Sequence, residues 1–298
     1  MRIIPIILIS LIASAAAAQL SSAYVDVRDC GMVAHVYRFL DLAESSAVLL
    51  LGGSSGGIGW QDEMSAKLSE RGFVALALAY FGMDSLPKEL ERIPLEYFDH
   101  ALAWLRAQPY VDPSRIGIGG VSKGGELALL IASRHPEVRG VAVFVPSGMV
   151  FQSIAKGFPH TSSWTFQGKD LPFVAYGKVN NPKSTADIYR AGIEQADSTE
   201  ATTIPVERIQ GPILLISGRE DNLWPSTMLS DMIVTRLRAH NFAHPIEHIA
   251  YPDAGHLISS IRTDDVTHRG GTNEGNHKAQ VDGQRRFLDF FQRTLQRE

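Results

Sequence analysis

Short apolar runs alternate along this chain with longer segments in which apolar residues recur every three or four positions. The runs occupy residues 47–51, 73–79, 116–119, 141–145, 213–217 and 246–251. Uninterrupted apolar runs of this length are typical of strands buried on both faces of a sheet. Because helical segments separate them, the pattern predicts an α/β fold in which a mostly parallel, doubly wound sheet carries helices on both faces.

The intervening helices are visible as apolar stripes. Phe98, Leu102 and Leu105 recur at helical spacing, and Pro94 stands where a helix would begin. The same kind of stripe is formed by Leu229, Ile233 and Leu237, and by Val281, Leu288, Phe291 and Leu295. Each stripe provides one apolar face that can pack on the sheet.

Residues 147–209 interrupt this rhythm. The segment is polar and rich in glycine and proline, and it is long for a connection inside a compact domain. Long irregular insertions usually form lids or binding loops. We therefore expect an irregular cap insertion over the functional site, inside a single domain that spans residues 19–298.

The first 18 residues have the features of an export signal. Met1 and Arg2 form a short basic start, residues 3–13 are mostly apolar, and a run of small residues ends at Ala18. The apolar run is too short to span a bilayer, and no later segment reaches the ~20 apolar residues that spanning needs. We expect cleavage near Ala18, an exported protein (periplasmic or secreted) and no stable membrane insertion.

Charge and cysteine content narrow the function classes. The formal net charge is -4, which gives no basic surface of the kind that nucleic-acid binding needs. Cys30 is the only cysteine, so neither an intrachain disulfide nor a cysteine-based zinc cluster can form. We expect Cys30 to be a buried thiol with a packing role.

The candidate nucleophile lies in the motif Gly120-Val-Ser122-Lys-Gly124. A short apolar strand precedes this motif and a strong helix former follows it, which is the context of a nucleophile elbow. A side chain at either glycine would crowd the sharp turn that exposes the serine hydroxyl. Ser122 is therefore predicted to be a catalytic nucleophile.

A serine nucleophile needs a base and an acid, which follow it along the chain in this fold. The strand at 213–217 runs into an acidic loop in which Asp221 is the preferred acid and Glu220 the alternative. His256 follows the last predicted strand on a glycine turn, so it is the predicted base. Among the other histidines, His160, His268 and His277 lie where they could reach substrate.

Two backbone N–H groups are expected to form the oxyanion hole. One belongs to Lys123, directly after the nucleophile, and the other to Ser54 in the glycine-rich loop 51–57. That loop lacks the motifs of phosphate-binding loops, which argues against a nucleotide cofactor. Pro245 interrupts the series His240, His244 and His248, so no metal or other cofactor is expected.

With these residues in place, the chain resembles the C-terminal catalytic domain shared by acyl-CoA thioester hydrolases and bile acid-CoA:amino acid N-acyltransferases. The likeness covers roughly residues 47–295. It is carried by the segments 73–82, 86–87, 93–98, 120–126, 210–216, 251–256, 270–271 and 277–282. The resemblance implies an α/β-hydrolase fold, with Ser122, Asp221 and His256 matching the nucleophile, acid and base of the family.

Two departures from the family shape the expected function. Eukaryotic members carry an N-terminal β-sandwich domain, for which we expect no counterpart because few residues precede the first strand. The acyltransferase branch typically uses a cysteine nucleophile, so Ser122 favours transfer of the acyl group to water. We therefore expect a serine hydrolase acting on a small-molecule acyl thioester or carboxylic ester. The alternatives are an acyltransferase with another acceptor and a non-catalytic ligand-binding module.

Overall fold

A computed structural model of the protein describes residues 24–39, 44–196 and 199–296. The export signal predicted for residues 1–18 lies outside these residues. Within the described part, no helix combines the length and the apolar character needed to cross a bilayer.

The core of the molecule is an eight-stranded sheet with the order β1-β2-β4-β3-β6-β7-β10-β11. The strands are β1 (Tyr24–Asp29), β2 (Met32–Tyr37), β3 (Ser45–Leu51), β4 (Val74–Ala79), β6 (Val111–Val121), β7 (Val138–Phe144), β10 (Ile213–Gly218) and β11 (Ile246–Tyr251). Strands β3, β4, β6, β7, β10 and β11 pair in parallel, whereas β2 runs antiparallel to both β1 and β4. Each predicted strand overlaps one of these strands, and the mostly parallel sheet is confirmed.

Two details at the sheet edges differ from expectation. The hairpin of β1 and β2 was not anticipated, although β1 alternates exposed and half-buried positions. Cys30 lies in the turn of this hairpin and is exposed, so the prediction of a buried thiol is wrong. At the other edge of the sheet, β11 pairs with a strand on one side alone, which is β10. It is therefore half-buried along its whole length.

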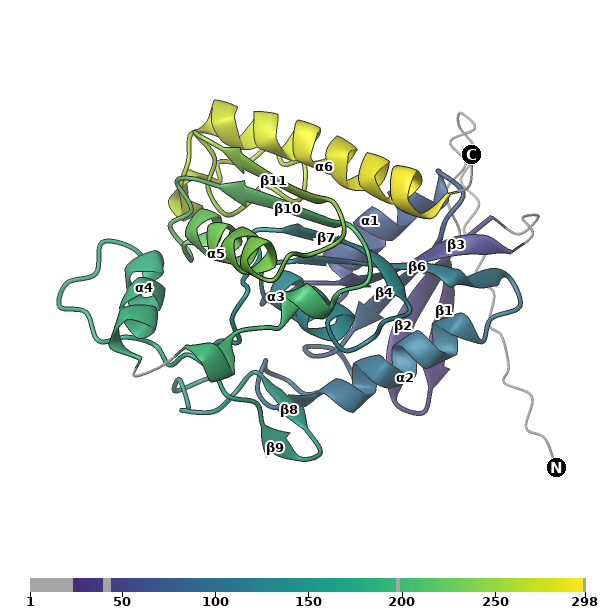
Figure 1. Cartoon of the computed structure of the whole chain (residues 1–298), viewed down its shortest axis with the longest axis horizontal. Helices are drawn as coiled ribbons and strands as arrows, with labels where there is room; N and C mark the ends of the chain where they lie inside the picture. The colour runs from purple at the N-terminus through teal and green to yellow at the C-terminus, as the bar shows by residue number, and fades with distance from the viewer. Residues whose placement is uncertain (1–23, 40–43, 197–198, 297–298) are drawn as a thin grey trace.

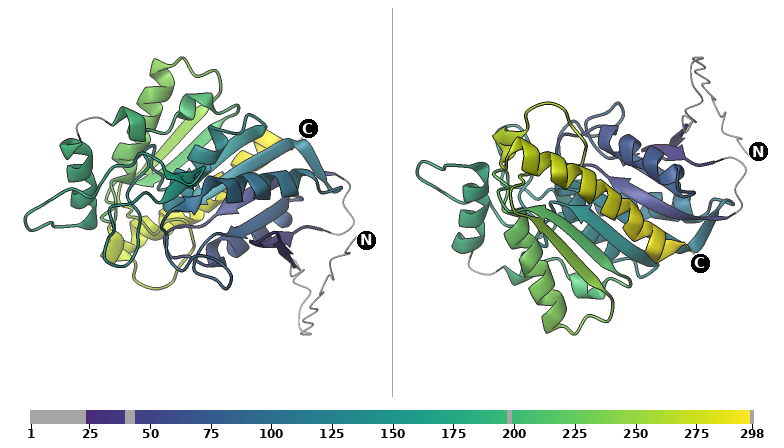
Figure 2. Two further views of the ribbon diagram at one scale, coloured as in Figure 1. Left: turned by 90° about the horizontal axis from the view of Figure 1, so that it is seen from below. Right: turned by 90° about the horizontal axis from the view of Figure 1, so that it is seen from above.

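Helices cover both faces of the sheet, as predicted. One face carries α2 (Leu95–Arg106), α3 (Lys123–Ala132) and α5 (Ser226–Ala239), and the other carries α1 (Gly59–Ser69) and α6 (Asn273–Leu295). Figure 1 shows α1 and α6 together on one side of the strands, and the right view of Figure 2 shows α6 crossing over them. Pro94 precedes α2 with an extended backbone, in agreement with its predicted place at the helix start.

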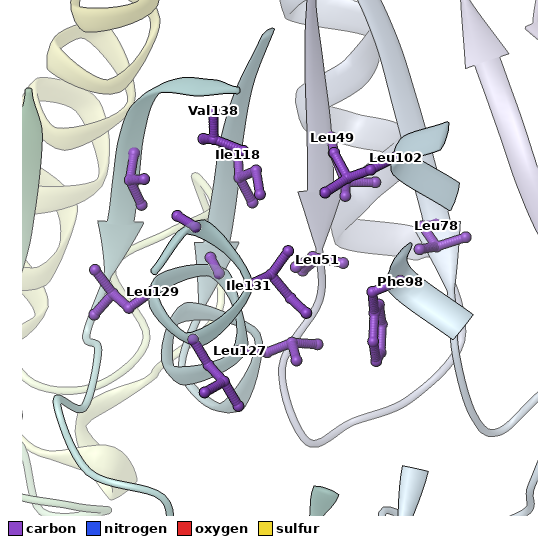
Figure 3. Packing of buried hydrophobic residues seen from close by; sticks show 14 of the residues in the cluster. Leu49, Leu51, Leu78, Phe98, Leu102, Ile118, Leu127, Leu129, Ile131 and Val138 are labelled. Atoms are coloured by element: carbon purple, nitrogen blue, oxygen red, sulfur yellow. The ribbon is translucent and has the colours of Figure 1, made fainter. Parts of the chain in front are cut away.

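Two apolar layers hold the helices on the sheet. In the first, Leu49 and Ile118 of the strands meet Leu127 and Ile131 of α3 and Leu102 of α2, all fully buried (Figure 3). In the second, Phe287 and Phe291 of α6 pack on the opposite face with Leu50, Phe144 and Ile216. Burial of apolar surface stabilises a fold by about 25 cal/mol per Å². These two layers therefore stabilise the sheet whose strand ends carry the candidate site.

The segment 147–209 is more ordered than the sequence suggested. It contains β8 (Trp164–Phe166) and β9 (Lys169–Asp170), which join β5 (Ile93–Pro94) in a small sheet, and the helix α4 (Thr185–Gln195). Two short 3-10 helices, η1 (Glu200–Thr202) and η2 (Val206–Arg208), lead back to β10. Helix α4 stands out at the margin of the molecule in the views of Figures 1 and 2.

Candidate active site

Ser122 occupies a sharp turn between β6 and α3. Its φ of 56° and ψ of -121° lie in a region that non-glycine residues rarely adopt. The backbone N–H of Ser122 donates to the carbonyl oxygen of Phe144, and its own carbonyl oxygen accepts from Glu126 N–H, both at 2.9 Å. These two bonds hold the strained turn in place, which is the pattern seen where strain serves a site.

The two motif glycines are required by close backbone packing. A Cβ atom at Gly124 would collide with the carbonyl oxygens of Leu51 and Gly52, and one at Gly120 would collide with the carbonyl oxygen of Gly124. The elbow is therefore pressed against the end of β3. For Gly120 the clash lies within the turn, as predicted, whereas Gly124 is required by the close approach of β3.

The three residues predicted from the sequence meet at the carboxyl edge of the sheet. His256 Nε2 lies 3.0 Å from Ser122 Oγ, and His256 Nδ1 lies 2.8 Å from Asp221 Oδ2. All three residues are buried, with less than a tenth of their surface exposed. When Nδ1 donates its proton to the carboxylate, Nε2 is left as the acceptor for the serine hydroxyl.

The carboxylate of Asp221 is fixed on both of its oxygens. While Oδ2 faces His256, Oδ1 accepts the backbone N–H of Leu223 at 2.9 Å and that of Trp224 at 3.2 Å. Glu220, the alternative acid, is exposed, and its backbone N–H donates to the carbonyl oxygen of Ala254. Asp221 is thus the acid that contacts His256.

A cavity of about 720 Å³ opens at Ser122 and His256. Its walls come from the loop 52–56 and the start of α1, from residues 257–264 and Arg269, and from Val121 and Leu223. The loop that connects β11 to η3 (Thr267–Arg269) provides Leu257 and Ile261, and Arg269 is the last residue of η3. No described residue of 147–209 lines this cavity, and the expectation that this segment covers the site stays a prediction.

The expected oxyanion donors stay predictions, although their surroundings fit the role. Lys123 is the first residue of α3, and the first N–H groups of a helix have no acceptor inside the helix. Ser54 lines the cavity beside Ser122. The neighbouring Gly53 approaches closely, since a Cβ there would lie 3.2 Å from Ser122 Cβ.

The remaining histidines do not line the cavity at Ser122. The ring of His160 contacts that of Phe173 edge to face, and His268 is exposed. His240 ends α5, whereas His248 lies in β11 and contacts Ser217 and Asp231, so the two do not share a helical face.

Away from this site, one group among the residues that the structure describes could hold a metal ion. The ligand atoms of Asp29, Cys30 and His100 lie within 4.8 Å of one another. The expectation that Ser122 acts without a metal stays a prediction.

Sequence reasoning missed Trp224, which connects the acid to the base. Its backbone N–H binds Asp221, its indole N–H donates to the carbonyl oxygen of Val145 at 3.0 Å, and its ring lies 6.1 Å from that of His256. The spacing of Asp221 and Trp224, three residues apart in a loop, is compatible with a side chain that caps a turn. No pattern in the sequence indicated that the indole would reach the histidine.

Solved structures with a similar fold include two named hydrolases. The acylaminoacyl peptidase of Pyrococcus horikoshii superposes with a TM-score of 0.61 at 17% identity, covering 89% of this chain and 39% of the peptidase. MGS-M1, an α/β hydrolase from a deep-sea metagenome library of the Medee basin, gives a TM-score of 0.55 at 19% identity, covering 91% of this chain and 98% of that chain. The predicted α/β-hydrolase fold is confirmed.

Relatives in sequence point to one family. Mouse mitochondrial acyl-coenzyme A thioesterase 2 is 32% identical over 254 residues, which is 80% of this chain and 53% of the mouse protein. The human counterpart is 31% identical over 261 residues, which is 82% of this chain and 51% of the human protein. This chain thus spans about half the length of the curated relatives it matches. The model of the family "BAAT / Acyl-CoA thioester hydrolase C terminal" matches residues 93–297, and the chain belongs to this family.

Proposed function

We propose that this protein is a serine hydrolase that cleaves an acyl thioester or a carboxylic ester through an acyl-enzyme on Ser122. The observation that carries the proposal is the hydrogen-bonded series Ser122–His256–Asp221 on a strained elbow. Membership of a family whose relatives are named acyl-coenzyme A thioesterases supports the substrate class.

In the first half of the reaction, Ser122 Oγ attacks the acyl carbonyl carbon while His256 Nε2 takes the hydroxyl proton. The carbonyl oxygen becomes an oxyanion, which the N–H groups of Lys123 and Ser54 stabilise together with the positive end of α3. The bond to the leaving group then breaks, and His256 returns its proton to the departing thiolate or alkoxide. Asp221 keeps the imidazole in the required tautomer throughout.

In the second half, the acyl-enzyme is cleaved by water. His256 Nε2 removes a proton from the water, whose oxygen attacks the acyl carbon, and the proton returns to Ser122 Oγ as the acid leaves. Another acceptor could replace water by the same steps. Analysis of products in the presence of added amines or alcohols separates hydrolysis from transfer.

An activity panel on the purified protein tests the proposal. Acyl-CoA thioesters and simple acyl esters are offered to the wild type, to Ser122→Ala and to Ser259→Ala, a serine in the wall of the same cavity. Turnover that is abolished in Ser122→Ala and retained in Ser259→Ala supports the proposal. A folded wild type that hydrolyses neither substrate class and does not react with a fluorophosphonate probe would exclude it.

We further propose that the chain is exported, on the basis of its first 18 residues. Expression of the full chain with a C-terminal tag, followed by cell fractionation and N-terminal sequencing, tests this part. Mature protein that begins near Gln19 outside the cytoplasm is the expected result. Cytoplasmic protein that retains residues 1–18 would contradict it.

A further inference from the structure

We propose that the segment 147–209 positions the nucleophile elbow from behind, through a buried ion pair between Lys123 and Glu126 that Trp164 holds in place. The inference rests on the proposed serine hydrolase function and assigns Lys123, Glu126 and Trp164 as positioning residues for it. It gives the segment a role other than that of a lid over the substrate.

The ion pair lies in the first turn of α3, directly after Ser122. Lys123 Nζ is 2.7 Å from Glu126 Oε1 and 2.8 Å from Oε2, and the two side chains are 1% and 0% exposed. Further contacts to the pair come from the segment 147–209. The indole N–H of Trp164 donates to Glu126 Oε1 at 2.7 Å, and Lys123 Nζ lies 3.4 Å from the carbonyl oxygen of Phe151.

Charges buried to this degree are costly, so their partners matter. Burial raises the pKa of the Glu126 carboxyl and lowers the pKa of the Lys123 ammonium, while attraction between the two groups opposes both shifts. A buried ion pair depends on good geometry and on hydrogen bonds to its remaining atoms, and removal of one partner leaves an uncompensated charge. The side-chain charge of Lys123 therefore has a role of its own, which is to compensate the buried carboxylate of Glu126, in addition to the role of its backbone N–H.

The ion pair is joined to the proposed oxyanion hole through the backbone. Lys123 carries the N–H expected to face the oxyanion, and Glu126 N–H binds the carbonyl oxygen of Ser122 at 2.9 Å. Both members of the pair thus belong to the turn that fixes the nucleophile. A shift of Trp164 or Phe151 would be transmitted to this turn through side chains that have no room to move, since protein interiors are close-packed.

The same segment also reaches the acid and the base. The ring of Phe151 lies 6.1 Å from that of Trp224, which in turn lies 6.1 Å from the ring of His256. Tyr189 of α4 packs against both Phe151 and Trp224, with ring centroids 5.0 and 5.7 Å apart. The segment 147–209 therefore reaches the nucleophile through the ion pair and His256 through Trp224, whereas the cavity at Ser122 is lined by residues outside this segment.

Replacement of Trp164 by Phe tests the proposal with a small change. The variant keeps an aromatic ring to pack on Phe98, and it loses the N–H bond to Glu126 together with part of the ring that faces Lys123 Nζ. Because small errors in the position of reacting groups are costly to rate, we expect kcat to fall about 10-fold with KM unchanged. The rate of labelling by a fluorophosphonate should fall by a similar factor. Trp104→Phe, in α2, is the matched control and should keep both values.

A second variant removes the charges together. Lys123→Met with Glu126→Leu leaves no unpaired charge, so it is expected to fold, whereas either single change is expected to be strongly destabilised. We expect the double variant to be folded by circular dichroism and to have a lowered kcat at unchanged KM. A role confined to stability predicts instead that the folded double variant keeps the wild-type kcat.

The outcomes separate this inference from the proposed function. If the wild type hydrolyses esters and both variants keep its kcat, the positioning role is excluded and the hydrolase function stands. If KM rises while kcat is unchanged, the segment contacts substrate, and the inference is also overturned. If the folded wild type has no Ser122-dependent hydrolysis, the proposed function itself fails.

Discussion

The change Asp221→Asn tests the proposed tautomer control with almost no change in shape. The amide could face His256 with either its oxygen or its NH2 group. In the wild type, Oδ1 accepts two backbone N–H groups, from Leu223 at 2.9 Å and from Trp224 at 3.2 Å. Turning the NH2 group toward these donors would break both bonds and leave the buried N–H of Trp224 without an acceptor, at a cost of about 1–3 kcal/mol.

The amide oxygen of the variant should therefore stay on Leu223 and Trp224, with the NH2 group facing His256 Nδ1. His256 would then accept at Nδ1 and carry its proton on Nε2, where it cannot accept the hydroxyl proton of Ser122. In serine proteases the equivalent change lowers kcat about 10⁴-fold. A loss of this size corresponds to about 5.5 kcal/mol of transition-state stabilisation.

The assay has a kinetic and a spectroscopic part. The kinetic part compares kcat for a chromogenic acyl ester in the wild type, in Asp221→Asn and in Glu220→Gln, the neighbouring acid that does not contact His256. Nitrogen-15 NMR of the histidine ring reports which nitrogen of His256 carries the proton. A loss of less than about 10-fold in a folded Asp221→Asn protein, or a proton that stays on Nδ1, would refute the reasoning.

Three further changes test the fold, the cavity and one carboxylate. Gly124→Ala should lower the free energy of unfolding, measured by urea titration, by about 3 kcal/mol, because its Cβ collides with the carbonyl oxygens of Leu51 and Gly52. At Gly59 a Cβ meets no atom within 4 Å, so Gly59→Ala should not lower the free energy of unfolding. Ile261→Asp should raise KM for an apolar acyl ester about 3- to 10-fold, since this residue lines the cavity at Ser122. Phe158 is exposed in the segment 147–209, so Phe158→Asp should leave KM unchanged. Equal changes in KM for the two variants would contradict the assignment of the cavity. Burial raises the pKa of Asp282, but hydrogen bonds from Tyr251, Arg286 and Arg285 outweigh it and hold this pKa well below its usual value. A carboxyl with a depressed pKa stabilises the fold above the unfolded pKa of about 3.9 and loses this effect as pH falls toward the folded pKa, so the stability gap between the wild type and Asp282→Asn should narrow between pH 7 and pH 3. A difference in the free energy of unfolding between the two proteins that becomes larger at low pH would contradict the role assigned to Asp282.

The parts of the structure that local pattern determines could be predicted from the sequence. The strands that lead to Ser122 and Asp221 are largely buried, so they appear in the sequence as apolar runs. The strand that leads to His256 is half-buried, and a glycine turn in the sequence marks its end. Chain order and the carboxyl ends of parallel strands then bring the three residues to one edge. Gly120 was predictable because its clash arises within the turn, whereas the contact of Gly124 with the end of β3 joins distant segments.

Contacts between distant segments could not be predicted in this way. Glu126 and Trp164 are 38 positions apart, and no periodicity links an indole on a short strand to a carboxylate on a helix. The close spacing of Lys123 and Glu126 on a helix was a usable signal, yet it fits an exposed pair equally well. The polar composition of 147–209 suggested a loose cap, whereas Phe151, Trp164 and Tyr189 anchor the segment in the interior.

The central claim is that Ser122 carries the acyl group during turnover. Rapid quenching of the wild type with an excess of a chromogenic acyl ester, followed by digestion and mass spectrometry, measures this directly. We expect the mass of the peptide that contains Ser122 to increase by one acyl group, as fast as the leaving group is released, and we expect no such increase in Ser122→Ala. Full turnover with no acyl group on this peptide, or with the group on another residue, would contradict it.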